Sequence, residues 1–302
     1  MVSSLWMLLS AFLFAVLGAF VQLGTPDMGT MGIVCYRGIF AVTLIAVWAK
    51  ATGRTLGTRY LKQHLIRSLL GVSAMALWLY SLAALPLGTG MTLHYTTPLF
   101  MAAGAMIFSV IRHQPWEWKL GLCSLIGFGG VSMVMQPEFS ADQIVAAIAG
   151  LAGALIAALV GFQIRKLAEL KEPSWRVVYY FSWICIVVGF AGHAGFEKDL
   201  HVDMNTVWYA LGIGFAATFA QLAVTKAYGK GNIVLSAIMQ YFGIIFGALI
   251  GALLYGDVVS LRSAIGMLII IAAGVFASLT MKKAKPQKVK GEVNEKITAD
   301  HD

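Results

Sequence analysis

The sequence predicts an all-α polytopic membrane protein with ten transmembrane helices, arranged as two inverted five-helix repeats. Of its 302 residues, 59% are hydrophobic and only 12% are charged, whereas about 25% of the residues in a globular protein are charged. Residues 68–111 contain no Lys, Arg, Asp or Glu. Apolar runs close to the roughly 20 residues that a helix needs to cross a bilayer recur along the chain.

These apolar runs are separated by charged or turn-forming segments, which set the limits of each predicted span. The fifth run is short, so we expect it to need tilt or a thinned part of the bilayer. Between the third and fourth runs we expect a short uncharged turn at residues 86–90. The predicted spans are residues 5–23, 32–49, 68–85, 91–111, 120–135, 144–164, 177–196, 204–225, 233–255 and 264–281.

The positions of the basic residues predict the orientation in the membrane. If the N-terminus is cytoplasmic, 19 of the 22 Lys and Arg residues fall in inner loops or in the C-terminal tail. Lys198 and Arg262 then lie outside, and Arg37 lies within a span. Because short cytoplasmic loops retain Lys and Arg, we expect both termini to be cytoplasmic. This bias also explains the net charge of +8 without a nucleic-acid partner.

Five spans in each half predict that the second half enters the membrane inverted relative to the first. We expect one repeat at residues 1–136, a second at residues 143–282, and a disordered cytoplasmic tail at residues 283–302, which is polar and carries mixed charge. The repeat shows in hydropathy and topology more than in residue identity. A shift of 144 residues from the fourth span to the ninth gives no identities over residues 84–113.

The sequence offers no pattern of an enzyme site. No predicted span carries Asp or Glu, and the metalloprotease, nucleophile-elbow and phosphate-loop motifs are absent. Cys35, Cys123 and Cys185 lie in separate apolar runs without paired spacing, so we interpret them as packing residues. We therefore expect no catalytic residues, no cofactor and no metal.

Arg37 is the one charged residue that we predict inside a span. Burying such a residue without a partner costs at least about 2.5–3.5 kcal/mol, which makes it a candidate functional residue. In one interpretation Arg37 faces a cavity and pairs with a substrate carboxylate or phosphate. In the other it extends to the outer interface, about 9 Å away along the helix.

The fourth span begins with a polar and aromatic cluster that includes His94, Tyr95, Thr97 and Pro98. Pro98 has no N–H to donate to the carbonyl of His94, which is tolerable only where another polar group reaches that carbonyl. We therefore expect this face to line a wet cavity. His94 is then a substrate ligand or a proton carrier, or it is a histidine satisfied by a neighbouring helix.

Further polar and aromatic residues lie within the other spans. Gln163, Gln240 and Tyr241 in the second half either line the cavity or form interhelical hydrogen bonds, which contribute only about 0.6 kcal/mol each. Trp78 and Tyr80 lie at mid-depth, away from the interfaces that aromatic residues prefer, so one of them is expected to stack on substrate. The candidate substrate-binding residues are Arg37, Trp78, His94, Tyr95, Thr97, Pro98, Gln163, Gln240 and Tyr241.

With these features the chain resembles the drug/metabolite transporter superfamily, and within it the EamA-type transporters. The resemblance rests on the ten spans, on Tyr36-Arg37-Gly38, on the glycine-rich fifth and tenth spans, and above all on ALPLGTGMTLHYTTPLF at residues 84–100. That hairpin is similar to a pattern in a subgroup that includes S-adenosylmethionine and riboflavin uptake carriers. Gly88 and Gly90 stand where small alanine-like residues are usual, and His113 replaces the acidic residue that often ends the fourth span.

The resemblance implies a secondary transporter of a small polar metabolite in a bacterial cytoplasmic membrane. It implies alternating access without an organic cofactor, and a cavity lined by the first four spans and by the sixth to ninth. An exporter of amino acids or drugs is the alternative within transport. A noncatalytic membrane scaffold or sensor, or an intramembrane enzyme, is the alternative from another class. A homodimer is a further expectation.

Overall fold

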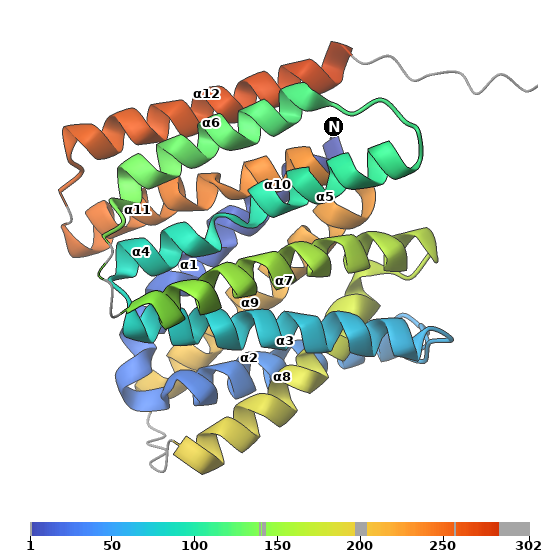
Figure 1. The fold of residues 1–302 in the computed structure, drawn as a ribbon. Coiled ribbons are helices and arrows are strands. Elements are labelled where there is room, and N and C mark those ends of the chain that lie inside the picture. The colour runs from blue at the N-terminus through green and yellow to red at the C-terminus, as the bar shows by residue number, and fades with distance from the viewer. Residues whose placement is uncertain (1, 139, 141–142, 197–203, 257, 284–302) are drawn as a thin grey trace, which may run out of the picture.

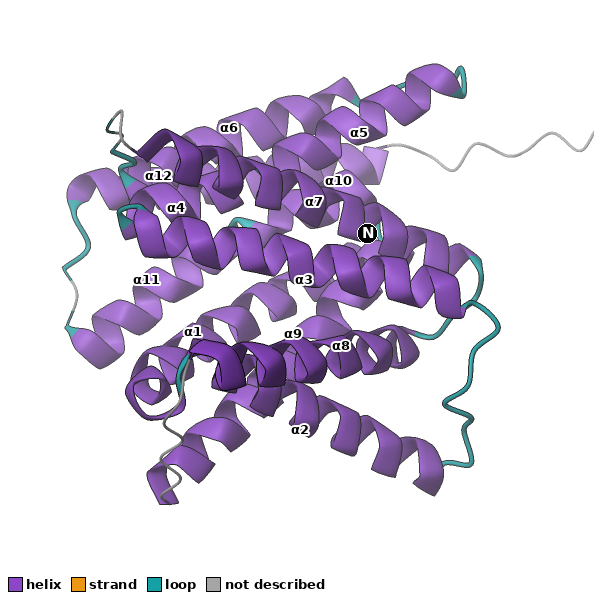
Figure 2. Cartoon of the chain, turned by 60° about the horizontal axis from the view of Figure 1, so that its bottom comes forward, coloured by secondary structure: helices purple, strands orange, loops and turns teal. Residues whose placement is uncertain are grey.

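The computed structural model describes residues 2–138, 140, 143–196, 204–256 and 258–283. Over these residues the chain is α-helical with short connections and has no strand (Figure 2). Ten of its segments are long and apolar enough to cross a membrane, so the predicted all-α fold with ten spans is confirmed. Lys198 and residues 284–302 of the predicted tail lie outside the described residues.

The helices cross the molecule in roughly the same direction and are joined by short loops (Figure 1). A short 3-10 helix, η1, precedes them at Val2–Leu5. In chain order they are α1 Trp6–Met28, α2 Thr30–Ala51, α3 Leu61–Ala84, α4 Leu87–His94, α5 Thr97–Ile111, α6 Trp118–Met135, α7 Ile144–Glu169, α8 Ser174–Phe196, α9 Met204–Lys230, α10 Ile233–Gln240, α11 Phe242–Tyr255 and α12 Leu261–Lys283.

The connection between the third and fourth spans is shorter than we predicted. The turn comprises only Leu85 and Pro86, and residues 87–90 already belong to α4, so the turn predicted at residues 86–90 is wrong. The carbonyl of Pro86 accepts hydrogen bonds from the backbone N–H groups of Thr89 and Gly90. These bonds begin α4 directly after the proline, whose fixed φ angle suits a helix N-terminus.

Two spans are broken in the middle of their length. The fourth span consists of α4 and α5, separated by Tyr95 and Thr96, and Pro98 lies in the first turn of α5. Proline fits there because the first turn of a helix has no intrahelical partner for its N–H. The ninth span consists of α10 and α11, separated by Tyr241 alone.

The spans pack against one another in four long pairs: α1 with α9, α2 with α8, α3 with α7, and α6 with α12. In Figure 1, α6 and α12 form one edge of the bundle, whereas α2 and α8 lie at the opposite edge. The pair α6 and α12 approach through Gly130 and Gly266. A Cβ on either glycine would lie 2.7 Å from the backbone oxygen of the other, so this close approach requires both.

A buried apolar cluster surrounds both helix breaks. It draws Tyr95 and Met101 from the fourth span, Leu235 and Tyr241 from the ninth, and Tyr228 from the end of α9. The breaks therefore lie inside the protein, where water does not freely satisfy the exposed backbone groups.

Candidate functional site

Four aromatic side chains form a continuous row across the two helix breaks. The ring centroids of Trp78 and His94 are 4.9 Å apart, those of His94 and Tyr95 are 6.0 Å apart, and those of Tyr95 and Tyr241 are 6.2 Å apart. We call these four residues the aromatic row. It runs from α3, through the end of α4 and the first break, to the second break before α11.

Two buried nitrogen atoms of the aromatic row have no hydrogen-bond partner. These are Nε1 of Trp78 and Nδ1 of His94. A buried polar atom without a partner costs about 1–3 kcal/mol, so native proteins rarely leave one unless another molecule or water satisfies it. Tyr80, the alternative to Trp78, is 52% exposed and points out of the bundle. Of the two mid-depth aromatic residues, Trp78 is therefore the one that faces the interior.

The other two rings of the row are held by the helices around them. The hydroxyl of Tyr241 donates a hydrogen bond of 3.2 Å to the backbone oxygen of Ser124 in α6, and its side chain is fully buried. The Tyr95 hydroxyl points at Gly243 of α11, where an added Cβ would lie 3.1 Å from it. Tyr241 thus fixes the second break against α6, and the small residue at 243 leaves room for Tyr95.

Thr97 satisfies the carbonyl that Pro98 leaves free. Its hydroxyl lies 2.8 Å from the backbone oxygen of His94 and 3.3 Å from that of Ala154 in α7. A polar group therefore does reach this carbonyl, as the sequence required, but that group belongs to the protein. Thr97 and Pro98 are both buried and shape the break.

The structure does not bring Gln163 to the aromatic row. Its Nε2 atom donates to the backbone oxygen of Gln63, near the start of α3, over 3.3 Å. Gln63 precedes Trp78 by 15 residues, or about 22 Å along the helix. Gln240, by contrast, directly precedes Tyr241, and its Oε1 accepts a hydrogen bond of 3.1 Å from the hydroxyl of Tyr228.

Arg37 lies on α2 beside a second arginine that the sequence analysis did not select. Its guanidinium carbon is 5.9 Å from the ring centroid of Phe181 in α8, and that of Arg67 is 4.0 Å from the same centroid. The predicted third span starts at residue 68, which puts Arg67 in the loop before it. In the structure α3 starts at Leu61, and Arg67 is only 2% exposed.

A helical pattern in the sequence marks the buried position of Arg67. Leu61, Leu65 and Leu69 recur every four residues and are 48%, 40% and 57% exposed on the outer surface of α3. With 3.6 residues per turn, His64 and Arg67 fall on the opposite, inward face. The many polar residues between Leu61 and Ser68 favour a loop in the sequence, whereas the outward stripe of leucines indicates the helix that the structure has.

The carboxylate of Glu172, between α7 and α8, ties together one end of the bundle. It accepts a 2.9 Å hydrogen bond from the hydroxyl of Thr58, lies 3.1 Å from Nε2 of His64, and forms an ion pair of 3.1 Å with Arg176. We call these four residues the Glu172 clamp. Burial raises the pKa of this carboxyl, but hydrogen bonds from Arg176, Thr58 and His64 outweigh burial, so the pKa lies below its ordinary value.

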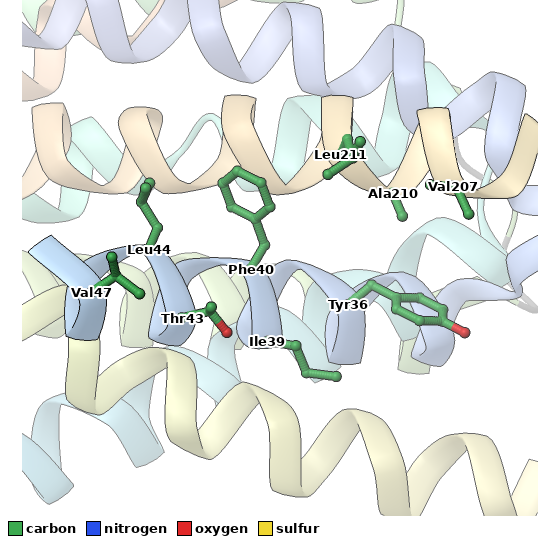
Figure 3. A pocket seen from close by; sticks show the side chains of 9 residues that line it. All are labelled: Tyr36, Ile39, Phe40, Thr43, Leu44, Val47, Val207, Ala210 and Leu211. Atoms are coloured by element: carbon green, nitrogen blue, oxygen red, sulfur yellow. The ribbon is translucent and has the colours of Figure 1, made fainter.

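An open groove of about 480 Å³ lies between α2 and α9 (Figure 3). Its lining is apolar apart from the hydroxyls of Tyr36 and Thr43. Ile39 and Val47 in this lining are 45% and 63% exposed on a spanning helix, so the groove faces the surroundings of the bundle. Such a surface suits lipid chains and lacks the polar groups of a metabolite site.

Comparison with known proteins agrees with this fold. The profile described as the EamA-like transporter family matches residues 1–136. A riboflavin transporter of Vibrio cholerae is 27% identical, and the match covers 90% of this chain and 91% of that protein. The first half of the chain is therefore similar to the EamA-like transporter family, in agreement with the resemblance drawn from the hairpin at residues 84–100.

Other proteins similar to this chain are named for different substrates. A pseudopaline exporter of Pseudomonas aeruginosa is 24% identical, and the match covers 91% of this chain and 95% of the exporter. An S-adenosylmethionine uptake transporter of Rickettsia bellii is 21% identical over 85% of this chain and 86% of its own. A crystal structure matches 93% of this chain and 99% of its own with a TM-score of 0.79 at 16% identity, which supports the fold alone.

These relatives place the protein among membrane transporters of small molecules and not among enzymes, as the sequence predicted. It is a multi-pass membrane protein with a small-molecule substrate.

Proposed function

We propose that this chain is an EamA-like secondary carrier that moves a small polar metabolite across the cytoplasmic membrane by alternating access. The observation that carries the proposal is the meeting of two broken spans, whose tyrosines Tyr95 and Tyr241 face each other with ring centroids 6.2 Å apart. Broken helices at mid-membrane, between two repeats, are where secondary transporters hold their substrates.

The inverted repeat, with halves at residues 1–136 and 143–282, is part of this proposal. The helices before the two breaks, α4 and α10, each have eight residues, and a tyrosine follows each. A shift of 146 residues places Leu87–His94 on Ile233–Gln240. The shift of 144 residues that gave no identities is therefore two residues out of register with the helix breaks.

The packing of the helices supports the same symmetry. If the first five spans are exchanged with the last five, the pair α1 and α9 becomes the pair α7 and α3, and both pairs are in contact. The pairs α2 with α8 and α6 with α12 each become themselves, as expected for contacts on a two-fold axis. The two halves then form the two walls of one pathway.

The aromatic row is the proposed substrate site. A planar part of the solute stacks on its rings, and the unpartnered nitrogens of Trp78 and His94 form hydrogen bonds to its polar part. Thr97 and Pro98 shape the break that brings His94 into the row. Gln163 and Gln240 stay predictions as substrate ligands.

Export is a second candidate direction. The relative named as a pseudopaline exporter favours it, whereas the relatives named for riboflavin and S-adenosylmethionine include an uptake protein. An alternating-access carrier without ATP moves solute down the combined gradient in either direction. Both directions therefore fit one site.

Counterflow in liposomes tests the proposal. Purified protein is reconstituted into vesicles loaded with unlabelled riboflavin, S-adenosylmethionine or amino acids, and entry of the same labelled solute is followed. We expect transient accumulation of at least one label, at least 10-fold lower in Trp78→Ala and His94→Ala and unchanged in Tyr80→Phe, whose side chain is exposed. Lack of counterflow with every class of solute would contradict a carrier and favour a scaffold.

Orientation and oligomeric state are further parts of the proposal. Both termini are cytoplasmic, and the protein pairs with a second copy. Single cysteines at His113 and Ser140, in a chain without its native cysteines, test the orientation. We expect a membrane-impermeant maleimide to label position 140 in intact cells and position 113 only after permeabilisation. The mass of the protein in lipid nanodiscs tests the dimer.

A further inference from the structure

The side chain of Arg67 is buried with most of its hydrogen-bonding capacity unused. It lies in α3 and is 2% exposed. Its Nη2 atom donates a 3.2 Å hydrogen bond to Oε1 of Gln221 in α9, whereas Nε and Nη1 have no partner. The flat guanidinium lies over the ring of Phe181 in α8, with its carbon 4.0 Å from the ring centroid.

Within the part of the chain that the structure describes, no acidic residue forms an ion pair with this charge. The helices around it, α2, α3, α8 and α9, contain no Asp or Glu between their ends. Among the described residues, both ion pairs use Glu172, and neither includes Arg67. A buried charge is stable only when a counter-charge or a full set of hydrogen bonds replaces water, and one amide oxygen and one aromatic face supply only part of that.

A half-buried arginine, Arg165 in α7, shows the contrast with a purely structural role. Its guanidinium donates to the backbone oxygens of both Gly229 and Gly231 near the end of α9. Nε and Nη1 of Arg67 have no such acceptor.

A glycine and a second cation lie near Arg67. Gly71, one turn further along α3, lets Arg67 and Phe181 pack closely, because an added Cβ would lie 3.4 Å from Nη1 of Arg67 and 3.0 Å from the Phe181 ring. Arg37 lies over the same ring at 5.9 Å, so the two guanidinium carbons are no more than about 10 Å apart.

We propose that Arg67, supported by Gln221 and Arg37, binds a carboxylate of the transported solute. This inference rests on the proposed carrier function and narrows its substrates to small organic acids and zwitterions. A guanidinium presents five N–H groups in a planar fork that matches the two oxygens of a carboxylate. Arg67 precedes Trp78 by 11 residues, about 16 Å along α3, so this carboxylate site is distinct from the aromatic row.

Ligand-dependent thermal unfolding of the purified full-length protein in lipid nanodiscs tests the carboxylate site. The probes are lactate, succinate, benzoate and glutamate, each paired with its uncharged or less charged amide, together with glycerol phosphate. We expect at least one acid to raise the unfolding midpoint, and its amide to bind at least 30-fold more weakly. In Arg67→Gln the acid should also bind at least 30-fold more weakly, whereas Arg112→Gln, which removes an exposed arginine, should bind as the native protein does.

Gln221→Glu provides a second test that does not remove the arginine. It places a carboxylate at the position of the amide oxygen that Arg67 already contacts. We expect this internal anion to raise the unfolding midpoint without ligand and to weaken binding of the acid at least 10-fold. A purely structural Arg67 would give the first effect without the second.

The outcomes separate this inference from the carrier function on which it rests. Undiminished acid binding in both Arg67→Gln and Gln221→Glu would overturn the site. Counterflow of neutral or cationic solutes, with binding of glycerol phosphate alone or of no acid, would overturn the carboxylate assignment and leave the carrier intact. Acid binding that depends on Arg67, without counterflow of any solute, would overturn the carrier and leave a binding site.

Discussion

The Nε2 atom of His64 lies 3.1 Å from Oε2 of Glu172, although the two residues are 108 positions apart. This contact joins the first turn of α3 to the connection between α7 and α8. Because Glu172 also accepts from Thr58 and pairs with Arg176, one carboxylate holds the loop at residues 52–60 against the end of the bundle. Arg176 and Tyr180 add hydrogen bonds to the backbone oxygens of Thr55 and Leu56.

The Glu172 clamp predicts a loss of stability in acid. Burial raises the pKa of Glu172, but its hydrogen bonds lower the pKa by more than burial raises it. The pKa therefore lies below its ordinary value of 4.5. A carboxyl whose pKa is lower in the folded state stabilises that state above its unfolded pKa, and this stabilisation disappears as the pH falls through the folded pKa. We expect the thermal unfolding midpoint, measured in detergent, to fall steeply as the pH drops below 4.5, the ordinary pKa of this carboxyl.

Glu172→Gln tests whether this carboxylate causes the acid-sensitive step. The side chain is only 6% exposed, and the substitution removes the ion pair with Arg176, a charge-assisted hydrogen bond that contributes about 1.5–3 kcal/mol. The midpoint at pH 7 should fall, and its remaining dependence on pH between 3 and 5 should be much shallower. Glu117→Gln, which alters an exposed carboxyl at the start of α6, is the matched control. An equally steep acid transition in Glu172→Gln would contradict this account.

Thr97→Val should destabilise the first helix break. Without the Thr97 hydroxyl, the His94 carbonyl loses its 2.8 Å partner, and Pro98 has no N–H to replace it. A buried polar group left unpaired costs about 1–3 kcal/mol. Thr92→Val is the control, because the Thr92 hydroxyl bonds to the Gly88 oxygen, which α4 also pairs through its own backbone. Equal unfolding midpoints in the two variants would mean that another group donates a hydrogen bond to the backbone oxygen of His94.

The fold was largely predictable because its cause, burial of apolar helices in lipid, leaves a pattern along the chain. The breaks at Tyr95 and Tyr241 were harder to see. Pro98 signals the first, but the second has no proline, and Tyr241 lies between two apolar segments that read as one span of residues 233–255. Its position depends on the hydrogen bond to Ser124 in another helix, which no local pattern reveals.

The candidate residues were predictable by type more than by partner. Polarity and depth selected His94 and Trp78, which the structure stacks together. The same criteria selected Gln163, which bonds to a backbone oxygen far along α3. They missed Arg67, because its neighbours in sequence are polar whereas its neighbours in space are Phe181 and Gln221. The sequence therefore shows which polar groups are present, and tertiary packing determines which of them are in contact.

Gly88→Ala should separate α4 from α6. A Cβ at this position would collide with the backbone oxygen of Met135, which explains why this position requires glycine. The close approach also lets the Thr89 hydroxyl donate a hydrogen bond to the backbone oxygen of Glu138 and accept one from its backbone N–H. Each bond is 2.8 Å long. We expect a loss of about 1–3 kcal/mol, seen as a lower unfolding midpoint.

Gly129→Ala is the matched control for that prediction. It makes the same change within α6, where an added Cβ would meet nothing within 4 Å. Because alanine favours a helix over glycine by up to about 1 kcal/mol, this variant should be as stable as the native protein or more so. A similar loss in both variants would place the cost in the helix itself and not in the contact with Met135.

Tyr241→Phe should affect stability more than substrate affinity. The Tyr241 hydroxyl bonds to the Ser124 oxygen inside the bundle, so its loss removes about 0.5–1.5 kcal/mol and leaves the ring in the aromatic row. We expect a lower unfolding midpoint and a change of less than threefold in the KM for counterflow. Trp78→Phe, which keeps a ring but removes the unpartnered Nε1 donor, should show the opposite pattern: an unchanged or higher midpoint and a higher KM. A large rise in KM for Tyr241→Phe alone would mean that this hydroxyl leaves Ser124 to bind the solute during transport.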